Sequence, residues 1–334
     1  MNKSSMILSG VAVMAMAGMA SAGYWDTFST TWLPSGAQPN TLAGTVDLQN
    51  GWTTRDNFTT AVSVGRWDQQ IMQVNDANGN RKVFRMSNAI TSGTYSSQVF
   101  SATSGQVAGE ANAALWNNRG TNGSAALSPT QAGAYATSDT FYSKVAFRSA
   151  TGAAQSGLSL VLSPSAKQSA VRMSWLQLED KGSGFNVNFH DTGANGAFAP
   201  TSTNIASGLS YTALHTLEMG ITFVDGVNTV GGQVFGNDIV NVWLNGTLIH
   251  TGTTWESYYY TNTAERNAVA SGPGPRLQAV DSMLFRVAGT AATGASGNGF
   301  YFEDFAIGNT IVPAPGAAAL IGLAGLITGR RRNA

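Results

Sequence analysis

Strict alternation of apolar and polar residues is the feature that most limits the fold of this 334-residue chain. In 217–223, for example, apolar side chains occupy every second position, and polar or small residues occupy the positions between them. Successive side chains of a strand point to opposite faces, so a period of two predicts strands with one buried face. Short turns rich in Gly, Asn and Asp separate the segments, which predicts an all-β body built as an antiparallel two-sheet sandwich. The alternating segments are 141–148, 158–162, 171–175, 185–190, 217–223, 240–249, 283–287 and 300–307.

Two Asn-Gly pairs between apolar runs predict β-hairpins. One is Asn245-Gly246, and the other is Asn78-Gly79 within the polar stretch 75–80. Asn-Gly is the preferred pair for a two-residue hairpin turn, because both residues tolerate a positive φ. The stretch 75–80 also has oxygen-bearing side chains at alternating positions, so a Ca²⁺ loop is the alternative interpretation. It lacks the acidic terminus and full spacing of such a loop, which favours the turn.

The composition limits both the size of the body and its partners. Hydrophobic residues make up 43% of the chain, enough for a large core, whereas charged residues make up only 11%. Lys3 and Arg330 to Arg332 account for four of the 18 basic residues, which leaves 14 against 18 acidic residues and a net charge of −4 on the remainder. A mildly acidic body argues against nucleic acid as a partner. The chain has no cysteine, which excludes disulfides and thiolate metal sites.

The first 22 residues have the pattern of a signal peptide. Lys3 precedes an apolar segment over 6–19, which predicts a signal helix, and Ala20-Ser21-Ala22 follows. Small residues at Ala20 and Ala22 form a small-x-small cleavage site, so we expect export and cleavage after Ala22.

The last stretch of the chain combines a proline break, a short apolar run and a basic end. Val312-Pro313-Ala314-Pro315-Gly316 comes first, and Arg330-Arg331-Arg332 follows the apolar run. A helix over 316–329 would be about 21 Å long, at about 1.5 Å per residue, against a hydrocarbon core of about 30 Å. We therefore expect an apolar helix that anchors the chain in the membrane only transiently, with the arginines on the cytoplasmic side.

This order of features resembles the PEP-CTERM sorting signal. In that family a Pro-x-Pro-like motif, an apolar helix and a basic cluster are recognised by a membrane protease called exosortase. The usual Glu of the motif is Ala314 here, so the tail is a Pro-Ala-Pro-Gly variant, in which Val312, Pro313, Pro315, Gly316 and Arg330 to Arg332 match the signal. The resemblance covers only 312–332. It implies processing by an exosortase-like protease and a place at the cell surface or in the extracellular matrix of a Gram-negative-type bacterium.

The body resembles a second family at the level of fold. Its stretch 238–249 is similar to the strand–turn–strand of concanavalin A-like and laminin-G-like jelly rolls. Its stretch 299–308 is similar to their final strand, which runs beside the first. The expected organisation is therefore a signal peptide at 1–22, a jelly-roll body at 23–310 and a sorting tail at 311–334.

No motif in the chain predicts catalysis. The three histidines, His190, His215 and His250, are too far apart in sequence for a paired metal motif, and no Gly-x-Ser-x-Gly elbow occurs. Glycosidases need two carboxylates across one groove. The acidic pairs Glu179-Asp180 and Glu303-Asp304 are adjacent in sequence, so on regular strands the two side chains of each pair would point to opposite faces. We therefore predict no enzyme, no catalytic residue and no metal site.

The best candidates for binding a sugar are aromatic. Aromatic rings stack on the apolar faces of sugars, and Trp255, Tyr258 and Tyr260 lie in one aromatic-rich stretch. The alternative is that this stretch is a strand in which Tyr259 is buried and its neighbours lie at the surface. The sequence thus predicts a non-enzymatic surface or matrix protein that binds polysaccharide. An extracellular carbohydrate-active enzyme, a hydrolase or lyase with carboxylates from different strands, and a self-associating structural coat component are the alternatives.

Overall fold

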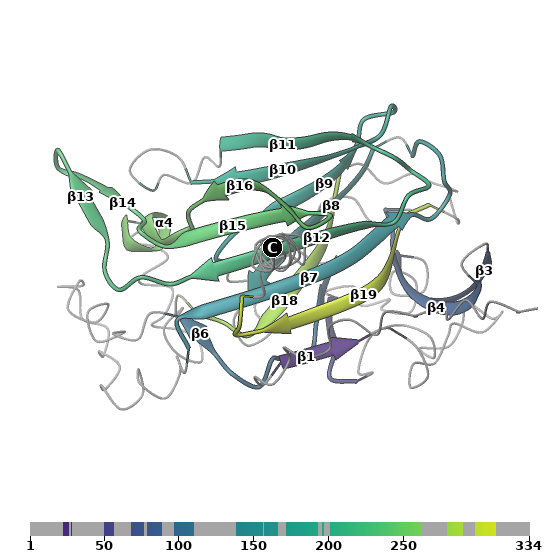
Figure 1. The fold of residues 1–334 in the computed structure, drawn as a ribbon, viewed down its shortest axis with the longest axis horizontal. Helices are drawn as coiled ribbons and strands as arrows, with labels where there is room; N and C mark the ends of the chain where they lie inside the picture. The colour runs from purple at the N-terminus through teal and green to yellow at the C-terminus, as the bar shows by residue number, and fades with distance from the viewer. Residues whose placement is uncertain are drawn as a thin grey trace, which may run out of the picture.

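Two antiparallel sheets stacked face to face form the body (Figure 1). The computed structural model describes residues 23–26, 28, 50–56, 68–76, 79–88, 97–109, 138–155, 157–165, 172–192, 196, 201–261, 279–289 and 298–311. The predicted signal peptide, sorting motif and terminal arginines lie outside these residues. No helix among the described residues is long and apolar enough to cross a membrane.

Sheet A faces the viewer in Figure 1 and is the larger of the two. Its strands in spatial order are β16 (Thr247–Gly252), β15 (Ile239–Leu244), β12 (His215–Thr222), β7 (Thr140–Ser149), β19 (Phe300–Gly308), β4 (Gly79–Met86) and β3 (Gln69–Asp76), and β1 (Gly23–Asp26) pairs with β19. The pairing of β1 with β19 is antiparallel and runs from Gly23 opposite Gly308 to Asp26 opposite Phe305. The expectation that the last strand runs beside the first is therefore confirmed.

Sheet B lies behind sheet A in Figure 1. Its strands in spatial order are β11 (Thr201–Leu209), β10 (Phe185–Asp191), β9 (Leu176–Asp180), β8 (Leu158–Ser165), β18 (Ser282–Gly289), β5 (Ser97–Phe100) and β2 (Thr53–Asp56). The smaller elements are the hairpin β13 (Asn228–Val230) and β14 (Gln233–Phe235), the pair β6 (Ala108–Gly109) and β17 (Ala279–Val280), and the helix α4 (Glu256–Thr261). The predicted fold class, an antiparallel two-sheet sandwich of the jelly-roll type, is confirmed.

The core lies between the inward faces of the two sheets. On β18, Met283, Phe285 and Val287 point into it, and the residues between them point outward. Burying one face of each strand removes apolar surface from water, at about 25 cal/mol per Å². At one end of the core, Trp52 lies among aromatic rings from four other segments, which are Phe28, Phe84, Phe285 and Phe305. We call these five residues the aromatic cluster.

Both predicted hairpins form, although only the first has its Asn-Gly pair as the turn, because Gly79 is already paired in β4. β15 and β16 meet with Leu244 opposite Thr247, so Asn245 and Gly246 form the turn, and both have positive φ, 51° and 79°. This matches a type I′ turn, which the Asn-Gly pair favours. β3 and β4 meet with Asp76 opposite Gly79, and residues 77 and 78 of this turn lie outside the described residues.

Two local predictions are wrong. The alternation at 171–175 does not mark a strand: Arg172 makes an isolated bridge to Ser165, and β9 begins only at Leu176. The stretch after Trp255 is the helix α4 and not a strand. In both places apolar residues are buried against the core from irregular or helical backbone, so tertiary packing overrides the local pattern.

Candidate functional site

A row of polar side chains crosses the outer face of sheet B. Strand register places Gln98 of β5 opposite Arg286 of β18, and Gln177 of β9 opposite Asn188 of β10. Asn204 of β11 continues the row opposite Asn188. On β8, Val161 is paired in register with Arg286 on one side and with Gln177 on the other, so the row is continuous across β8. We call Gln98, Arg286, Gln177, Asn188 and Asn204 the polar row. It spans six strands, or about 24 Å at about 4.8 Å between neighbours.

Hydrogen bonds between side chains connect the β9–β11 half of this row. Asn204 Nδ2 donates to Asn188 Oδ1 at 3.0 Å, and Asn188 Nδ2 donates to Glu179 Oε2 at 3.1 Å. Gln177 Nε2 donates to Ser159 Oγ at 2.7 Å. Each amide is thus oriented by a neighbour on the next strand, which fixes the donors and acceptors of this face before any ligand binds.

Trp175 lies at one side of the polar row, just before β9 begins. Its ring stacks on the imidazole of His190, with ring centroids 4.9 Å apart and an angle of 25° between the planes. The guanidinium groups of Arg172 and Arg286 lie over the indole at 5.2 and 5.4 Å from the ring. His190 is also 2.8 Å from Gln177 Oε1 through its Nε2, so the tryptophan and the polar row form one connected site.

Several polar atoms of this face are buried without a hydrogen-bond partner among the described residues. They include both amide atoms of Gln98, the indole Nε1 of Trp175, the hydroxyl of Ser174 and Nδ1 of His190. Leaving such a group unsatisfied costs about 1–3 kcal/mol, so each of these atoms calls for a partner such as a water molecule or a ligand. Burial lowers the pKa of His190, although Glu179 opposes the shift, so near pH 7 the ring is neutral.

Glu179 is the one carboxylate that the structure describes within the polar face of sheet B. It accepts hydrogen bonds from Asn188 and from Lys181, the latter at 2.7 Å. Two carboxylates across a groove, as a glycosidase needs, are not present among the described side chains of this face. Gln98, Asn188 and Arg286 are only 1%, 7% and 7% exposed, whereas Gln177 and Trp175 are half-buried and Asn204 is exposed. The β9–β11 half of the polar row is therefore the part suited to holding a hydroxyl-rich ligand, by amides and one aromatic ring.

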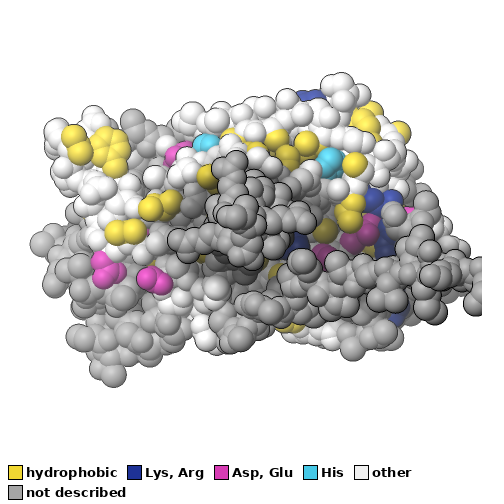
Figure 2. All heavy atoms as spheres, in the orientation of Figure 1, with side chains coloured by type: hydrophobic (Ala, Val, Ile, Leu, Met, Phe, Trp, Pro, Cys, Tyr) yellow, Lys and Arg dark blue, Asp and Glu magenta, His cyan; other side chains and the backbone are white. Residues whose placement is uncertain are grey.

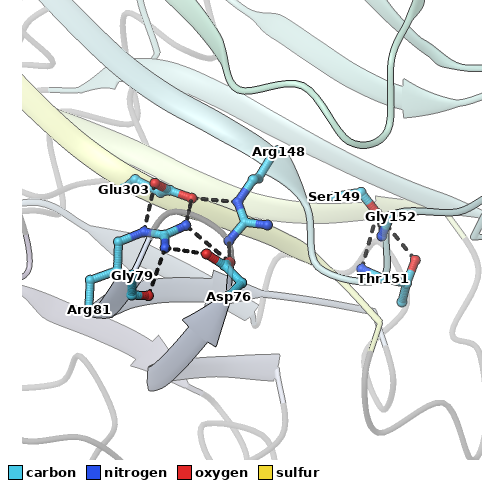
Figure 3. A network of polar contacts seen from close by, with 8 residues as sticks. All are labelled: Asp76, Gly79, Arg81, Arg148, Ser149, Thr151, Gly152 and Glu303. Carbon is cyan, nitrogen blue, oxygen red and sulfur yellow. Dashed lines mark hydrogen bonds and ion pairs between the residues drawn. The ribbon is translucent and has the colours of Figure 1, made fainter.

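The outer face of sheet A carries a different group of charged residues, visible as dark blue and magenta side chains on the right of Figure 2. Arg81 pairs with Asp76 at 2.6 Å and with Glu303 at 2.7 Å, and Arg148 pairs with the same two carboxylates (Figure 3). We call these four residues the charge quartet. Asp76 is the acidic residue of the stretch considered as a Ca²⁺ loop, and here two guanidinium groups occupy its oxygens.

The predicted arrangement of Glu303 and Asp304 is wrong. A bulge in β19 between Phe302 and Asp304 lets Phe302 and Phe305 both point into the core, so the two carboxylates lie on the same outer face. Burial would raise the pKa of Glu303, but hydrogen bonds from Arg81 and Arg148 outweigh it and lower the pKa. Burial and the neighbouring Glu303 raise the pKa of Asp304. Both oxygens of Glu303 are occupied by arginine, so this pair is not arranged as a hydrolytic dyad.

The structure places two of the predicted sugar-binding aromatics inside the body. Trp255 and Tyr258 are 2% and 8% exposed and belong to the core, and Trp255 Nε1 donates to the carbonyl of His190 at 2.9 Å. In this conformation neither ring offers a face to a ligand in solvent. The side chain of Tyr260 lies outside the described residues. Trp175 lies outside the aromatic-rich stretch singled out in the sequence; it packs against the core cluster and borders the polar face. The useful signal was the run of Gln, Asn and His residues on the outward positions of 177–190.

Comparisons with known proteins give resemblance in architecture only. No family model matches the sequence, and no curated protein matches it. Among solved structures, an endo-beta-1,4-glucuronan lyase from the fungus Trichoderma reesei is 12% identical with a TM-score of 0.37, over 81% of this chain and 96% of that one. The globular domain of T. cruzi calreticulin is 10% identical with a TM-score of 0.39, over 80% and 87%. An alginate lyase from Pseudomonas aeruginosa is 9% identical with a TM-score of 0.39, over 73% and 86%. The function must therefore be inferred from the residues of this chain.

Proposed function

We propose that the protein is an exported surface or extracellular-matrix protein that binds polysaccharide through the polar face of sheet B. The observation that carries the proposal is the polar row with Trp175 beside it. The part of the row on β9 and β11, where Gln177 is half-buried and Asn204 is exposed, spans about 10 Å at about 4.8 Å between neighbouring strands, which suits a short segment of a polymer. The oriented amides would bind hydroxyls, and the solvent-facing part of the half-buried indole would contact the apolar face of a sugar ring.

Binding can be measured by retention of the full chain on immobilised polysaccharides and by calorimetry with soluble ones. We expect Trp175→Ala and Gln177→Ala each to weaken binding about 10-fold or more, because each removes a central contact of the row. Trp243→Ala is the matched control, since Trp243 is a half-buried tryptophan of β15 on sheet A, away from the polar face. Retention on no polysaccharide, or equal loss in the control variant, would contradict the proposal and leave a self-associating coat component.

An enzyme acting on the same polymer is the second candidate. It is favoured by His190, a neutral imidazole held in the middle of the polar face between Trp175 and Gln177. Incubation of the full chain with each retained polysaccharide distinguishes the two functions. A binding protein leaves the polymer length unchanged, whereas a hydrolase or lyase releases shorter chains with new reducing or unsaturated ends.

We further propose that the tail is a sorting signal that is read and then removed. Its proline break, short apolar run and terminal arginines support transient attachment over permanent anchoring. Mass spectrometry of the protein from the cell surface should show a mature chain that begins at Gly23 and ends near 313–316. Deleting 312–334 should release the body into the medium. Recovery of surface protein that still carries Arg330 to Arg332 would refute the processing step.

A further inference from the structure

A pocket of about 380 Å³ opens at one end of sheet A, on the opposite side of the sandwich from the polar face of sheet B. It lies between the end of β3, the end of β7 and the loop that connects β11 to β12. The residues that give it chemical character are Asp76, Arg148, Thr151, Tyr211, Thr212 and Tyr301. Two aromatic rings, two opposite charges and two hydroxyls therefore meet in one open hollow.

The charged walls of this pocket are held in place before any ligand arrives. Arg148 is bound by both carboxylates of the charge quartet (Figure 3). Its guanidinium also lies over the ring of Tyr301, 5.3 Å from the ring centroid. Asp76 is fixed by Arg81 as well as by Arg148. Planar charged groups that are already oriented lose little conformational entropy when they bind hydroxyls.

The aromatic wall at Tyr211 is also rigid. Its hydroxyl donates to Asp180 Oδ1 at 2.7 Å and accepts the backbone N–H of Gly184 at 2.9 Å. Its ring packs edge-on against the buried Phe185, with centroids 4.9 Å apart. A ring fixed at both its hydroxyl and its edge provides a preformed wall for the apolar face of a sugar.

The charge of the pocket selects the class of ligand. The quartet contains two guanidinium groups and two carboxylates, which sum to zero, and each guanidinium is bonded to both carboxylates. Of these four groups, Asp76 and Arg148 line the pocket, so an acidic group would be repelled by Asp76 and a cation by Arg148. Neutral hydroxyls can bond to either kind of group.

We propose that this pocket is a second carbohydrate site, which binds a short segment of a neutral saccharide, and that the protein uses both sites to cross-link polymer chains. The cross-linking step rests on the proposed function of the polar face, whereas the pocket site does not. Because the two sites face away from each other, one polymer segment would meet only one of them, so two chains would be joined. Joined binding sites raise avidity well above the affinity of either.

The test fills the pocket without disturbing the charge quartet. Thr212 is an exposed loop residue that lines the pocket, and Thr212→Trp places a large ring there. Thr229→Trp is the matched control, because Thr229 is exposed on the β13–β14 hairpin and does not line the pocket. The probes are neutral oligosaccharides of glucose, mannose, galactose and N-acetylglucosamine, titrated into the full chain by calorimetry, with melting curves to show that each variant is folded.

We expect at least one probe to bind the wild-type chain and Thr212→Trp to weaken it 10-fold or more, while Thr229→Trp and Trp175→Ala leave it unchanged. Polymer sedimentation should need both sites, so Thr212→Trp and Trp175→Ala should each reduce it to background. The pocket proposal is overturned if no probe binds the wild-type chain, or if Thr212→Trp binds as the wild type does. If Thr212→Trp weakens probe binding but Trp175→Ala leaves polymer retention and sedimentation unchanged, the polar-face function fails and the pocket site stands.

Discussion

Trp52→Ala is expected to destabilise the body by about 3–5 kcal/mol, the range for removing a large aromatic from a well-packed core. Trp52 is fully buried, and its ring lies 5.1 to 5.7 Å from the rings of Phe28, Phe84, Phe285 and Phe305. Those rings come from both sheets and from the chain before β2, so the cavity would open where the sheets meet. The loss corresponds to a fall of about 10 °C in melting temperature for a chain of this size.

Two further variants separate the packing of Trp52 from its hydrogen bond. The indole Nε1 donates to the hydroxyl of Tyr24 at 2.9 Å, a contact between β1 and the core. Tyr24→Phe removes this bond while keeping the ring and should cost about 1 kcal/mol. Trp52→Phe keeps most of the ring volume and should fall between Tyr24→Phe and Trp52→Ala. Leu248→Ala, at a side chain that is 52% exposed on β16, is the surface control and should melt close to the wild type. A Trp52→Ala protein that melts within about 2 °C of the wild type would show that the cluster does not stabilise the fold.

The aromatic cluster also shows what local sequence can and cannot predict. β12 and β18 were predictable because each sends an apolar side chain into the core at every second position. Phe28 and Trp52 show no such period, since neither core residue lies in a strand. β11 (Thr201–Leu209) was not predicted because it is a largely exposed edge strand rich in Thr, Ser and Asn. It has too few apolar residues to produce an alternating pattern.

The candidate site was hidden from sequence reasoning by its dependence on register. Gln98 and Arg286 are far apart in the chain and become neighbours only when β5 pairs with β18. The bulge in β19 is likewise invisible in Glu303-Asp304, because one extra residue in a strand changes which face a side chain occupies. Trp255 and Tyr258 were selected for their aromatic character alone, and the fold uses that character for the core.

Asp238→Asn is expected to stabilise the protein near pH 7, by up to about 3 kcal/mol. Asp238 is 1% exposed, its Oδ1 accepts the N–H of Val224 at 2.9 Å, and its Oδ2 accepts the hydroxyl of Thr254. Burial raises the pKa of Asp238 to about 6, although both hydrogen bonds oppose the shift. In the unfolded chain an Asp has a pKa near 3.9, and a difference of about two units is equivalent to about 3 kcal/mol.

The raised pKa fixes the direction of the pH dependence. The folded state binds the proton more tightly, so the contribution of Asp238 is complete below about pH 4 and is lost as pH rises through about 6. When melting temperature is followed from pH 4 to pH 8, Asp238→Asn should lack the fall with rising pH that Asp238 causes in the wild type. Asp225→Asn, which removes the exposed like charge that helps to raise the pKa of Asp238, should keep most of the slope. Equal slopes in wild type and Asp238→Asn would contradict the assignment.

The contribution of Glu303 to stability changes with pH in the opposite direction to that of Asp238. The pH of maximum stability therefore reports on both groups. The pKa of Glu303 is lowered, so its ion pairs with Arg81 and Arg148 contribute above the ordinary carboxyl pKa and are lost as pH falls through the lowered value. These two groups together therefore favour a maximum between the loss of Glu303 in acid and the ionisation of Asp238 near pH 6. Asp238→Asn removes the loss of stability near pH 6 and keeps the loss of the Glu303 ion pairs in acid. The pH of maximum stability should therefore be higher in Asp238→Asn than in the wild type. A maximum that moves to lower pH, or stays in place, would mean that Asp238 is already ionised in the fold without a penalty.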